Sequence, residues 1–390
     1  MQAVVLKPSK DKAIRQHHPW IFSGAVAKLP TDFVDGDVLE VLSTDGFFLG
    51  LAYFNRQSNI IGRMISEERL PVAQILAQKI QAAIGLRKSL FGSQSQTNAF
   101  RLINSEGDNL PGLIVDQYDE LLVVQISTLG MSKLKDLIVA ELIRAVKPKA
   151  IYEKSVLPSR SQEGLANEEG WLYQSLSESV IVKENGLMFE VDPQQSQKTG
   201  LFLDQREMRS LVSGFAKDRS VLNCFSYTGG FSIAALAGGA LHATSIDVSK
   251  DAIVQTEKNV VLNHFSTQQH TGIVADVFEY LRQQEITQNL VILDPPAFAK
   301  KKADVFNACR GYKEINRLAM QKMPQHSFLL TCSCSYHVDE HLFQQLLFQS
   351  AYEAKRQIKI LQKHHLAYDH PINIYHPEGE YLKSFWLTVD

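Results

Sequence analysis

Between residues 220 and 335 the chain contains SVLNCFSYTGGF (220–231), ATSIDV (243–248), TGIVADV (271–277), NLVILDPP (289–296) and SFLLTCSCS (327–335). Each segment contains a short apolar run, and stretches with helical spacing of apolar residues separate them. Strands that are apolar on both faces are typical of a parallel sheet covered by helices. The region therefore predicts a doubly wound α/β domain, to which IKILQ (358–362) and SFWLTV (384–389) could add the last strands.

The composition of the whole chain is that of an ordinary globular protein. It has 390 residues, with 40 Lys and Arg against 42 Asp and Glu, a formal charge of −2, and 45% hydrophobic residues. The length predicts at least two domains, and the apolar fraction excludes a disordered chain. A charge near zero excludes a protein that coats polyanions with its whole surface, but it allows a local basic face.

Targeting signals, membrane spans and metal sites are not expected. No run reaches the roughly 18 apolar residues of a membrane span, and the first residues lack the apolar core of a signal peptide. We therefore expect a cytoplasmic protein that does not enter a membrane. The spacing of the four cysteines, Cys224, Cys309, Cys332 and Cys334, predicts neither a disulfide framework nor a zinc site.

The chain before the doubly wound region predicts two further units. Residues 1–70 contain short strand-like runs separated by turns and predict a small β-barrel or β-sandwich. Residues 71–98 predict a helix that begins near Pro71 and ends at Gly92, followed by a polar loop, and we expect this segment to link two domains. Strand-like runs around one amphipathic helix predict an α+β domain over 99–180, and we assign 181–390 to the doubly wound domain.

Ligands of a doubly wound sheet bind beyond the carboxyl ends of its strands, so the residues after each apolar run are the binding candidates. After the first run they are Phe225, Ser226, Tyr227, Thr228, Gly229 and Gly230. Paired glycines allow backbone to approach a ligand closely. Neither GxGxxG nor the P-loop pattern occurs, which argues against a cofactor that contains a diphosphate.

An acidic residue follows each of the next two runs. Asp247 is placed to accept hydrogen bonds from ribose hydroxyls, and Asp276 from an adenine amino group. A ligand with a ribose and an adenine but no pyrophosphate fits both, and S-adenosylmethionine (SAM) is the candidate. Each feature alone has a simpler explanation, because an Asp after a strand is more often a helix N-cap and Gly-Gly is a common turn. Their coincidence after three successive strands favours SAM over the nucleotide of a dehydrogenase.

The fourth and fifth runs end in residues suited to a reaction. Asp294-Pro295-Pro296 offers a carboxylate and stiff carbonyl groups to a nucleobase, with Phe298 available for stacking. The prolines could also simply end the strand. Cys332 is expected to be a buried apolar residue within the fifth strand, whereas Cys334 lies at its end, where a thiolate could reach a base.

A thiol at this position distinguishes two reactions. Carbon 5 of a pyrimidine is a poor nucleophile, and a thiolate that adds to carbon 6 enables carbon 5 to attack a sulfonium methyl group. A base then removes the proton from carbon 5, and the thiol leaves. Methylation of an exocyclic amino group needs no such nucleophile. Cys334 therefore favours C5 methylation over the alternative, amino methylation of guanine or adenine.

Two segments are locally basic although the whole chain is nearly neutral. Residues 300–322 contain seven basic residues, Lys300, Lys301, Lys302, Arg310, Lys313, Arg317 and Lys322, against Asp304 and Glu314. Residues 1–30 contain Lys7, Lys10, Lys12, Arg15 and Lys28 against Asp11, with His17, His18 and Trp20 among them. We expect RNA phosphates at the first segment, and structured RNA with stacking on Trp20 at the second. A solvated helix start and a lysine-rich strand edge are the alternatives.

Several segments together resemble the bacterial 23S rRNA 5-methylcytosine methyltransferases of the large-subunit methyltransferase I family. They are SQKTG (196–200), FLDQR (202–206), FSYTGGF (225–231), DPPAF (294–298), ACRGYK (308–313), SCS (333–335), YHPEG (375–379) and YLK (381–383). The resemblance covers nearly the whole chain. It implies an N-terminal PUA domain, a central α+β domain and a class I SAM-dependent methyltransferase domain.

The resemblance also implies roles for individual residues. Cys334 would be the nucleophile, and Asp294 would hold the cytosine ring or manage its proton. The cofactor site would also include Asp294, Lys198, Thr199, Gly200 and Asp204, and the RNA would contact Pro295, Pro296, Phe298, Lys300, Arg310 and Lys313. The partner would be 23S rRNA or a large-subunit assembly intermediate, with a homodimer left open.

One position departs from the pattern of related enzymes. RNA 5-methylcytosine methyltransferases of other kinds carry a cysteine in the Asp-Pro-Pro loop that helps to release the product, and Ala297 stands there in this chain. Product release must then work differently. An alternative of another class is a noncatalytic RNA-binding protein that has kept the cofactor fold.

Overall fold

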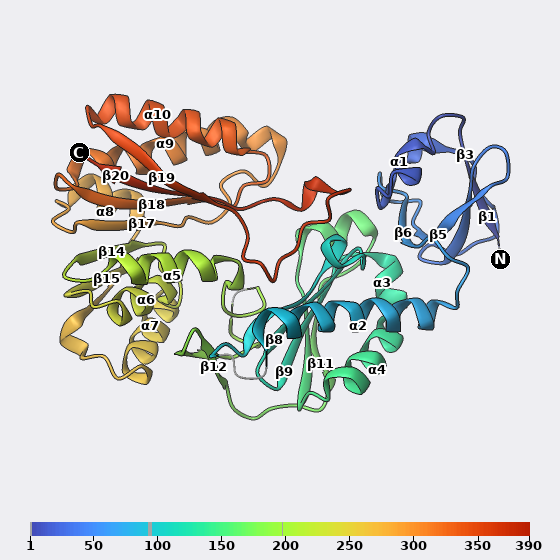
Figure 1. Ribbon diagram of the computed structural model, residues 1–390, viewed down its shortest axis with the longest axis horizontal. Helices are drawn as coiled ribbons and strands as arrows, with labels where there is room; N and C mark the ends of the chain where they lie inside the picture. Colours follow the sequence, from blue (N-terminus) through green and yellow to red (C-terminus); the bar gives the residue numbers. More distant parts are fainter. Residues whose placement is uncertain (1, 93–95, 197) are drawn as a thin grey trace. The chain divides into compact units, whose positions relative to one another are not determined.

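The computed structural model describes residues 2–92, 96–196 and 198–390. Part of the polar loop predicted over 93–98, and Gln197 of the SQKTG segment, lie outside the described residues. The chain forms two compact units, and their helices and strands are labelled in Figure 1. The first unit contains Met1–Val182, Val191–Gly200 and Tyr368–Gly379, and the second contains Lys183–Glu190, Leu201–Ala367 and Glu380–Asp390.

The second unit is built on a seven-stranded sheet with the order β16-β15-β14-β17-β18-β20-β19. The strands are β14 (Ser220–Cys224), β15 (His242–Asp247), β16 (His270–Val274), β17 (Leu290–Leu293), β18 (Ser327–Ser333), β19 (Ile358–His364) and β20 (Lys383–Val389). The first five of these are parallel, and β20 runs antiparallel to both of its neighbours, β18 and β19. This topology confirms the predicted doubly wound sheet, including the two late strands.

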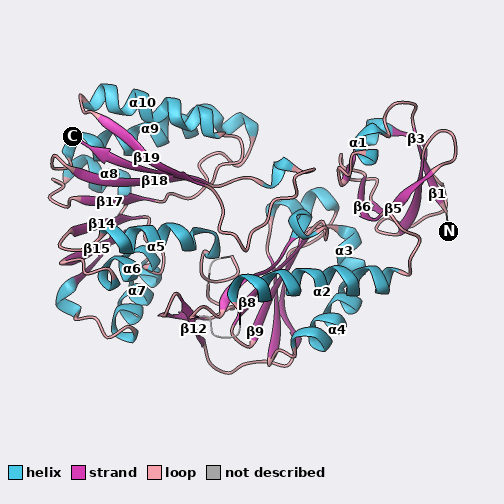
Figure 2. Cartoon of the chain, in the orientation of Figure 1, coloured by secondary structure: helices cyan, strands magenta, loops and turns pink. Residues whose placement is uncertain are grey.

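Helices cover both faces of this sheet, as Figure 2 shows. One group consists of α5 (Arg206–Phe215), α6 (Gly230–Ala237) and α7 (Lys250–Leu262), and the other of α8 (Val277–Gln283), α9 (Val305–Lys322) and α10 (Glu340–Ala354). In the second group, Tyr312 of α9 and Phe343 of α10 pack in one core with Leu222, Val291 and Leu329 of the strands. Burial on both faces explains why the strands are apolar throughout.

The first unit contains a six-stranded sheet with the order β2-β6-β5-β4-β1-β3. Its strands are β1 (Ala3–Leu6), β2 (Trp20–Ile21), β3 (Val26–Lys28), β4 (Val38–Leu42), β5 (Phe48–Phe54) and β6 (Gly62–Ser66), with the short helix α1 (Lys12–Arg15) between β1 and β2. Buried apolar residues at alternate positions, such as Val4 and Leu6, form its core. The predicted β-rich N-terminal region is confirmed.

A second sheet of the first unit has the order β11-β10-β9-β8-β7. Its elements are β7 (Ala99–Asn104), β8 (Leu113–Tyr118), β9 (Leu121–Ile126), β10 (Ala150–Ser155) and β11 (Glu168–Tyr173), with α3 (Leu129–Lys133) and α4 (Lys135–Val146). The helix predicted after Pro71 is α2 (Val72–Phe91), and Gly92 follows it. Its buried face, which includes Ile80, packs in the core of this sheet, so α2 is also a layer of the α+β fold.

Two short strands, β12 (Val180–Glu184) and β13 (Leu187–Val191), form a separate two-stranded sheet. Among the described residues, no helix combines the length and the hydropathy needed to cross a membrane.

Candidate active site

The residues predicted to bind or react follow the carboxyl ends of neighbouring parallel strands in the second unit. The loop 225–230 follows β14, Asp247 ends β15, Asp294 follows β17, and Cys334 follows β18. Because β14, β15, β17 and β18 are parallel neighbours, these residues lie along one edge of the sheet. Asp276 lies two residues beyond β16, at the same edge. The structure therefore brings together the main residues that the sequence singled out.

The loop after β14 is held by a network of hydrogen bonds. Phe225 and Tyr227 adopt left-handed backbone conformations, with φ of 59° and 48°. The carboxylate of Asp247 accepts a hydrogen bond of 2.8 Å from the Tyr227 amide and one of 2.9 Å from the Ser249 amide. Thr256 of α7 donates to the Tyr227 carbonyl over 3.0 Å. The loop shape thus depends on Asp247 and on α7.

Gly229 has a structural reason to be glycine in addition to the predicted one. Its φ is +80°, and a Cβ there would lie 2.3 Å from Cγ2 of Thr256. The residue therefore allows a left-handed turn packed tightly against α7. The contact that requires glycine here is with α7, and close approach of a ligand to this loop stays a prediction.

The same edge fits a nucleoside that carries hydroxyl and amino groups. Ser226 is buried, and its hydroxyl has no hydrogen-bond partner among the described residues. Asp276 is exposed, and its Oδ1 accepts from the Glu279 amide over 3.0 Å as the N-cap of α8. The simpler explanation of Asp276 as a cap is therefore correct. It uses one carboxylate oxygen, and a ligand could use the other.

The Asp294 turn is oriented by a residue to which no separate role was assigned. Nε2 of Gln205 donates to Oδ1 of Asp294 over 2.9 Å, and Gln205 is only 2% exposed. Its neighbour Asp204, predicted to bind the cofactor, accepts a 2.5 Å hydrogen bond from the Tyr381 hydroxyl. Both belong to the 3₁₀ helix η4 (Leu203–Gln205). The only sequence signal for Gln205 is its place in FLDQR, one of the segments that carry the family resemblance.

The two cysteines at the end of β18 have different surroundings. Cys332 is fully buried, and burial together with the nearby Asp294 carboxylate raises the pKa of its thiol well above the usual value. Cys334 is partly exposed, and its Sγ lies 3.6 Å from the Pro295 carbonyl, to which it donates. The expected buried role of Cys332 agrees with this environment. The contrast favours Cys334 as the reactive thiol.

Phe298 takes part in an aromatic cluster. Its ring centroid lies 4.6 Å from that of Tyr312 and 5.7 Å from that of Phe278. Phe225 lies farther away, with a centroid distance of 6.3 Å. These contacts cover part of the Phe298 ring within the protein. The side chain is partly exposed, and only the exposed part of the ring could stack on a base.

Some of the basic side chains after the Asp-Pro-Pro turn are paired within the protein, which the sequence did not predict. Lys300 and Arg310 are exposed. In contrast, Lys313 forms a 3.0 Å ion pair with Glu353 of α10, and Arg317 lies 3.8 Å from the same carboxylate. The charge of Lys313 is therefore partly neutralised in the protein. The sequence could not predict this, because Glu353 is 40 residues away.

Trp20 of the N-terminal segment is also engaged within the protein. Its indole nitrogen donates to Oε1 of Glu106 over 2.9 Å, and its ring contacts His376 with a centroid distance of 4.3 Å. These contacts occupy part of the Trp20 ring, and stacking of an RNA base on its partly exposed remainder stays a prediction. Lys7, Lys10, Lys12 and Lys28 are exposed, while Arg15 pairs with Asp11 at 2.6 Å.

Three residues predicted for the cofactor site, Lys198, Thr199 and Gly200, belong to the first unit. Thr199 is buried and donates to Oδ2 of Asp116 over 2.6 Å. Lys198 is exposed. Their contact with the cofactor stays a prediction.

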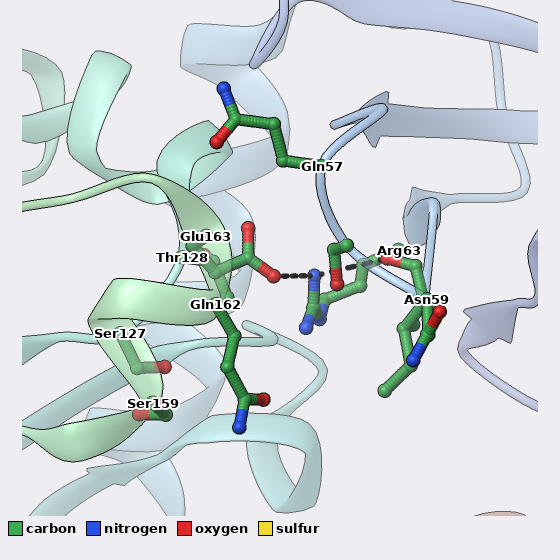
Figure 3. Close-up of a pocket in the computed structure, with 10 residues that line it drawn as sticks. Gln57, Asn59, Arg63, Ser127, Thr128, Ser159, Gln162 and Glu163 are labelled. Carbon is green, nitrogen blue, oxygen red and sulfur yellow. Dashed lines mark hydrogen bonds and ion pairs between the residues drawn. The ribbon is translucent and has the colours of Figure 1, made fainter.

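Figure 3 shows a pocket in the first unit, with a volume of about 460 Å³. Arg63 and Glu163 form a 2.8 Å ion pair within it, and amide and hydroxyl groups of Asn59, Ser159 and Gln162 line it. None of the predicted site residues lines this pocket. In the described part of the chain, no group of three or more His, Cys, Asp or Glu residues could hold a metal ion.

Two family models match the chain. Residues 4–67 match the PUA-like domain, and residues 141–359 match the S-adenosylmethionine-dependent methyltransferase family. These matches confirm the predicted fold class and the predicted cofactor, SAM. Bound SAM would supply an electrophilic methyl group, and Asp247, Ser226 and Asp276 are the residues that would hold it.

The chain is similar along its whole length to curated proteins named ribosomal RNA large subunit methyltransferase I. The protein from Alteromonas mediterranea is 40% identical over 392 residues, which cover 99% of this chain and 98% of the relative. The protein from Aliivibrio fischeri is 38% identical over 393 residues and 99% of both chains.

Two solved structures are also similar to this chain. Each match covers 99% of this chain and 100% of the solved chain. A chain from Streptococcus mutans that carries a SAM-dependent methyltransferase assignment has a TM-score of 0.84 and 26% identity. A chain with a methyltransferase assignment, complexed with SAH, has a TM-score of 0.85 and 26% identity.

Proposed function

Since this chain belongs to the ribosomal RNA large subunit methyltransferase I family, we propose that it methylates carbon 5 of a cytosine in 23S rRNA, with Cys334 as the nucleophile. The RNA would be free 23S rRNA or a large-subunit assembly intermediate in the cytoplasm. SAM-dependent methyl transfer itself follows from the family match.

The observation that supports this proposal is the position of Cys334. It lies just past β18 with its Sγ 3.6 Å from the carbonyl of Pro295, and it is partly exposed. Pro295 directly follows Asp294, so a thiol and a carboxylate border the same turn. Methylation of an exocyclic amino group would have no use for the thiol.

The chemistry assigns each side chain a step. The Cys334 thiolate adds to carbon 6 of cytosine, forming the Sγ–C6 bond and making carbon 5 nucleophilic. Asp294, held by Gln205, hydrogen-bonds the ring and stabilises the charge that develops on it. After carbon 5 has gained the methyl group, a base removes its proton, and the electron pair expels the Cys334 thiolate.

The basic residues near the turn would hold the RNA backbone. Lys300 and Arg310 are exposed and suited to phosphates, whereas Lys313 is paired with Glu353 and would contribute less. The target base must leave its stack to reach a thiol at the edge of the sheet. Pro295 and Pro296 would then border the extruded ring.

A trapping experiment tests the proposal. RNA that carries 5-fluorocytosine should form a lasting covalent adduct with the protein, because carbon 5 then lacks the proton that the base removes. We expect Cys334→Ala to abolish the adduct and to lower the rate of methylation by more than about 10³-fold. The affinity for SAM, measured by calorimetry, should stay within about twofold because Cys334 is not among the residues assigned to SAM.

The matched control is Cys332→Ala, which removes the buried neighbour and should still form the adduct. Full methylation activity in Cys334→Ala would overturn the mechanism. Mass analysis of the methylated nucleoside gives an independent answer, since a methyl group on an exocyclic amino nitrogen would establish the alternative reaction.

A further inference from the structure

Lys383 is a buried cation beside the reactive thiol. It is the first residue of β20 and lies opposite Ser333 in the pairing with β18, so Cys334 is the next residue along. It is only 4% exposed. Its ammonium group donates to the carbonyl oxygens of Ser335 and Tyr381 over 2.7 and 2.8 Å.

The ammonium group of Lys383 has no carboxylate partner at ion-pair distance among the described residues. An ammonium group has three donors, and two of them are used by the carbonyl oxygens. Buried charges in proteins are normally paired, because carbonyl oxygens replace only part of the lost hydration. The site therefore lacks a negative charge that would complete it.

Burial lowers the pKa of Lys383 to about 8, and the charges that oppose this shift belong to Cys334, Asp339 and Glu380, in that order. The two carboxylates have other partners. Asp339 caps α10 through a hydrogen bond from the Leu342 amide, and Glu380 pairs with His365. Cys334 is thus the group whose ionisation would supply the missing charge.

We propose that Lys383 is a positioning residue that holds Cys334 as a thiolate in the resting enzyme, an inference that rests on the proposed role of Cys334 as nucleophile. On ionisation, the proton of Cys334 leaves to solvent, the hydrogen bond from its Sγ to the Pro295 carbonyl is lost, and Lys383 keeps its own proton. The result is a thiolate and ammonium pair beside the Asp294 turn. The Asp294 carboxylate opposes ionisation of the buried Cys332. It also borders the turn of Cys334, where the ammonium group of Lys383 would offset its charge.

Neighbouring groups are compatible with this pair. Tyr312, whose pKa is raised to about 12 by burial and by Cys334, stays neutral and shares a 2.9 Å hydrogen bond with the Ser335 hydroxyl. Ser335 also accepts from the Ala299 amide over 3.0 Å. The carbonyl that holds Lys383 therefore belongs to a residue fixed on the side of the Asp-Pro-Pro turn. Through this hydrogen bond, Lys383 links β20 to the turn that follows Cys334.

The test measures the reactivity of the thiol without RNA. The rate of alkylation of Cys334 by iodoacetamide is followed against pH in a Cys309→Ser background, since Cys309 is the other partly exposed cysteine. Loss of a nearby cation destabilises a thiolate, so Lys383→Met should raise the apparent pKa of Cys334 by about 1 unit or more. Alkylation at a pH below both values should fall at least about tenfold.

Two variants serve as controls. Lys359→Met removes a lysine from β19 that is 72% exposed, and it should leave the pH profile unchanged. Lys383→Arg keeps the charge and should retain a lower thiol pKa than Lys383→Met. SAM binding by calorimetry shows whether each variant is folded.

A reciprocal measurement keeps the wild-type lysine and needs no change at β20. The carbon-13 signal of Lys383 Cε reports its titration, and Cys334→Ser should lower the pKa of Lys383 because the thiolate that stabilises the ammonium is gone. An unchanged Lys383 titration, or an unchanged alkylation profile in folded Lys383→Met, would overturn the inference. If these shifts occur but Cys334→Ala still methylates RNA fully, the proposed function fails and the charge pair stands.

Discussion

The edge of the seven-stranded sheet has two halves that are held in different ways. On the side of β15 and β16, the carboxylates of Asp247 and Asp276 accept hydrogen bonds from backbone amides. On the side of β17 and β18, Asp294 is bonded by the side chain of Gln205, and Cys334 donates to a backbone carbonyl. Side chains of the first half organise loops and helix starts, whereas those of the second half are organised by other parts of the chain.

This difference predicts that mutations in the two halves have different consequences. A carboxylate bonded to backbone amides contributes to stability, so its loss should affect both the fold and the affinity for the cofactor. Asp294 accepts a hydrogen bond from the side chain of Gln205, and it borders the turn of the reactive thiol. Changes at Asp294 should therefore act on turnover, and changes at Asp247 or Asp276 on binding and stability.

The largest of these effects is expected for Asp294→Asn. The amide oxygen of Asn can still accept the hydrogen bond from Gln205, so the turn should persist, but the negative charge is lost. We expect kcat to fall by about 10² to 10⁴-fold, as for the loss of a group that stabilises charge or moves a proton. Single-turnover methylation of rRNA at saturating SAM measures this effect.

The proposed difference between the two halves would be contradicted if Asp294→Asn mainly weakened the binding of SAM. A large rise in the dissociation constant of SAM, with an unchanged single-turnover rate, would move Asp294 to the cofactor half. Gln205→Glu is a companion variant, because it places a second carboxylate against Asp294 and should disturb the turn by repulsion.

Asp247→Asn should have a smaller effect, and this effect should be on stability and SAM binding, not on turnover. The carboxylate accepts two amide hydrogen bonds, whereas Asn has one acceptor oxygen, so one of the Tyr227 and Ser249 amides loses its partner. The free energy of unfolding should decrease by about 1–3 kcal/mol. The dissociation constant of SAM should rise about tenfold, because the loop 225–230 and the ribose partner change together.

Calorimetry with SAM and urea unfolding measure the two effects of Asp247→Asn in the same preparation. An unchanged single-turnover rate at saturating SAM is expected. A loss of turnover at saturation with normal SAM affinity would contradict the division of the edge into two halves.

The sequence alone predicts those features that depend on residues close together in the chain. The parallel strands were predictable because each is an apolar run, and the strand-end acids Asp247, Asp276 and Asp294 were predictable because a strand's carboxyl end fixes where the next residues point. The helix α2 was predictable from its apolar spacing between Pro71 and Gly92. These signals are local in the chain.

The partners of the reactive groups were not predictable, because they come from distant parts of the chain. Gln205 meets Asp294 across 89 residues, and Lys383 reaches Ser335 across 48. The second contact depends on β20 lying between β18 and β19, an order that no local pattern reveals. For the same reason, the ion pair of Lys313 with Glu353 and the hydrogen bond from Trp20 to Glu106 could not be predicted.

The smallest expected effect separates two roles of Asp276. Asn is as good an N-cap as Asp, so Asp276→Asn should keep the stability of α8, whereas Asp276→Ala should lower the free energy of unfolding by about 1 kcal/mol. Both an Asn oxygen and a carboxylate can accept from an adenine amino group. If Asp276 contacts SAM, its affinity should therefore fall severalfold in Asp276→Ala and stay nearly normal in Asp276→Asn. A loss of stability in Asp276→Ala with an unchanged dissociation constant for SAM would leave Asp276 as a helix cap alone, and the cofactor half of the edge would then depend on Asp247 and the loop after β14.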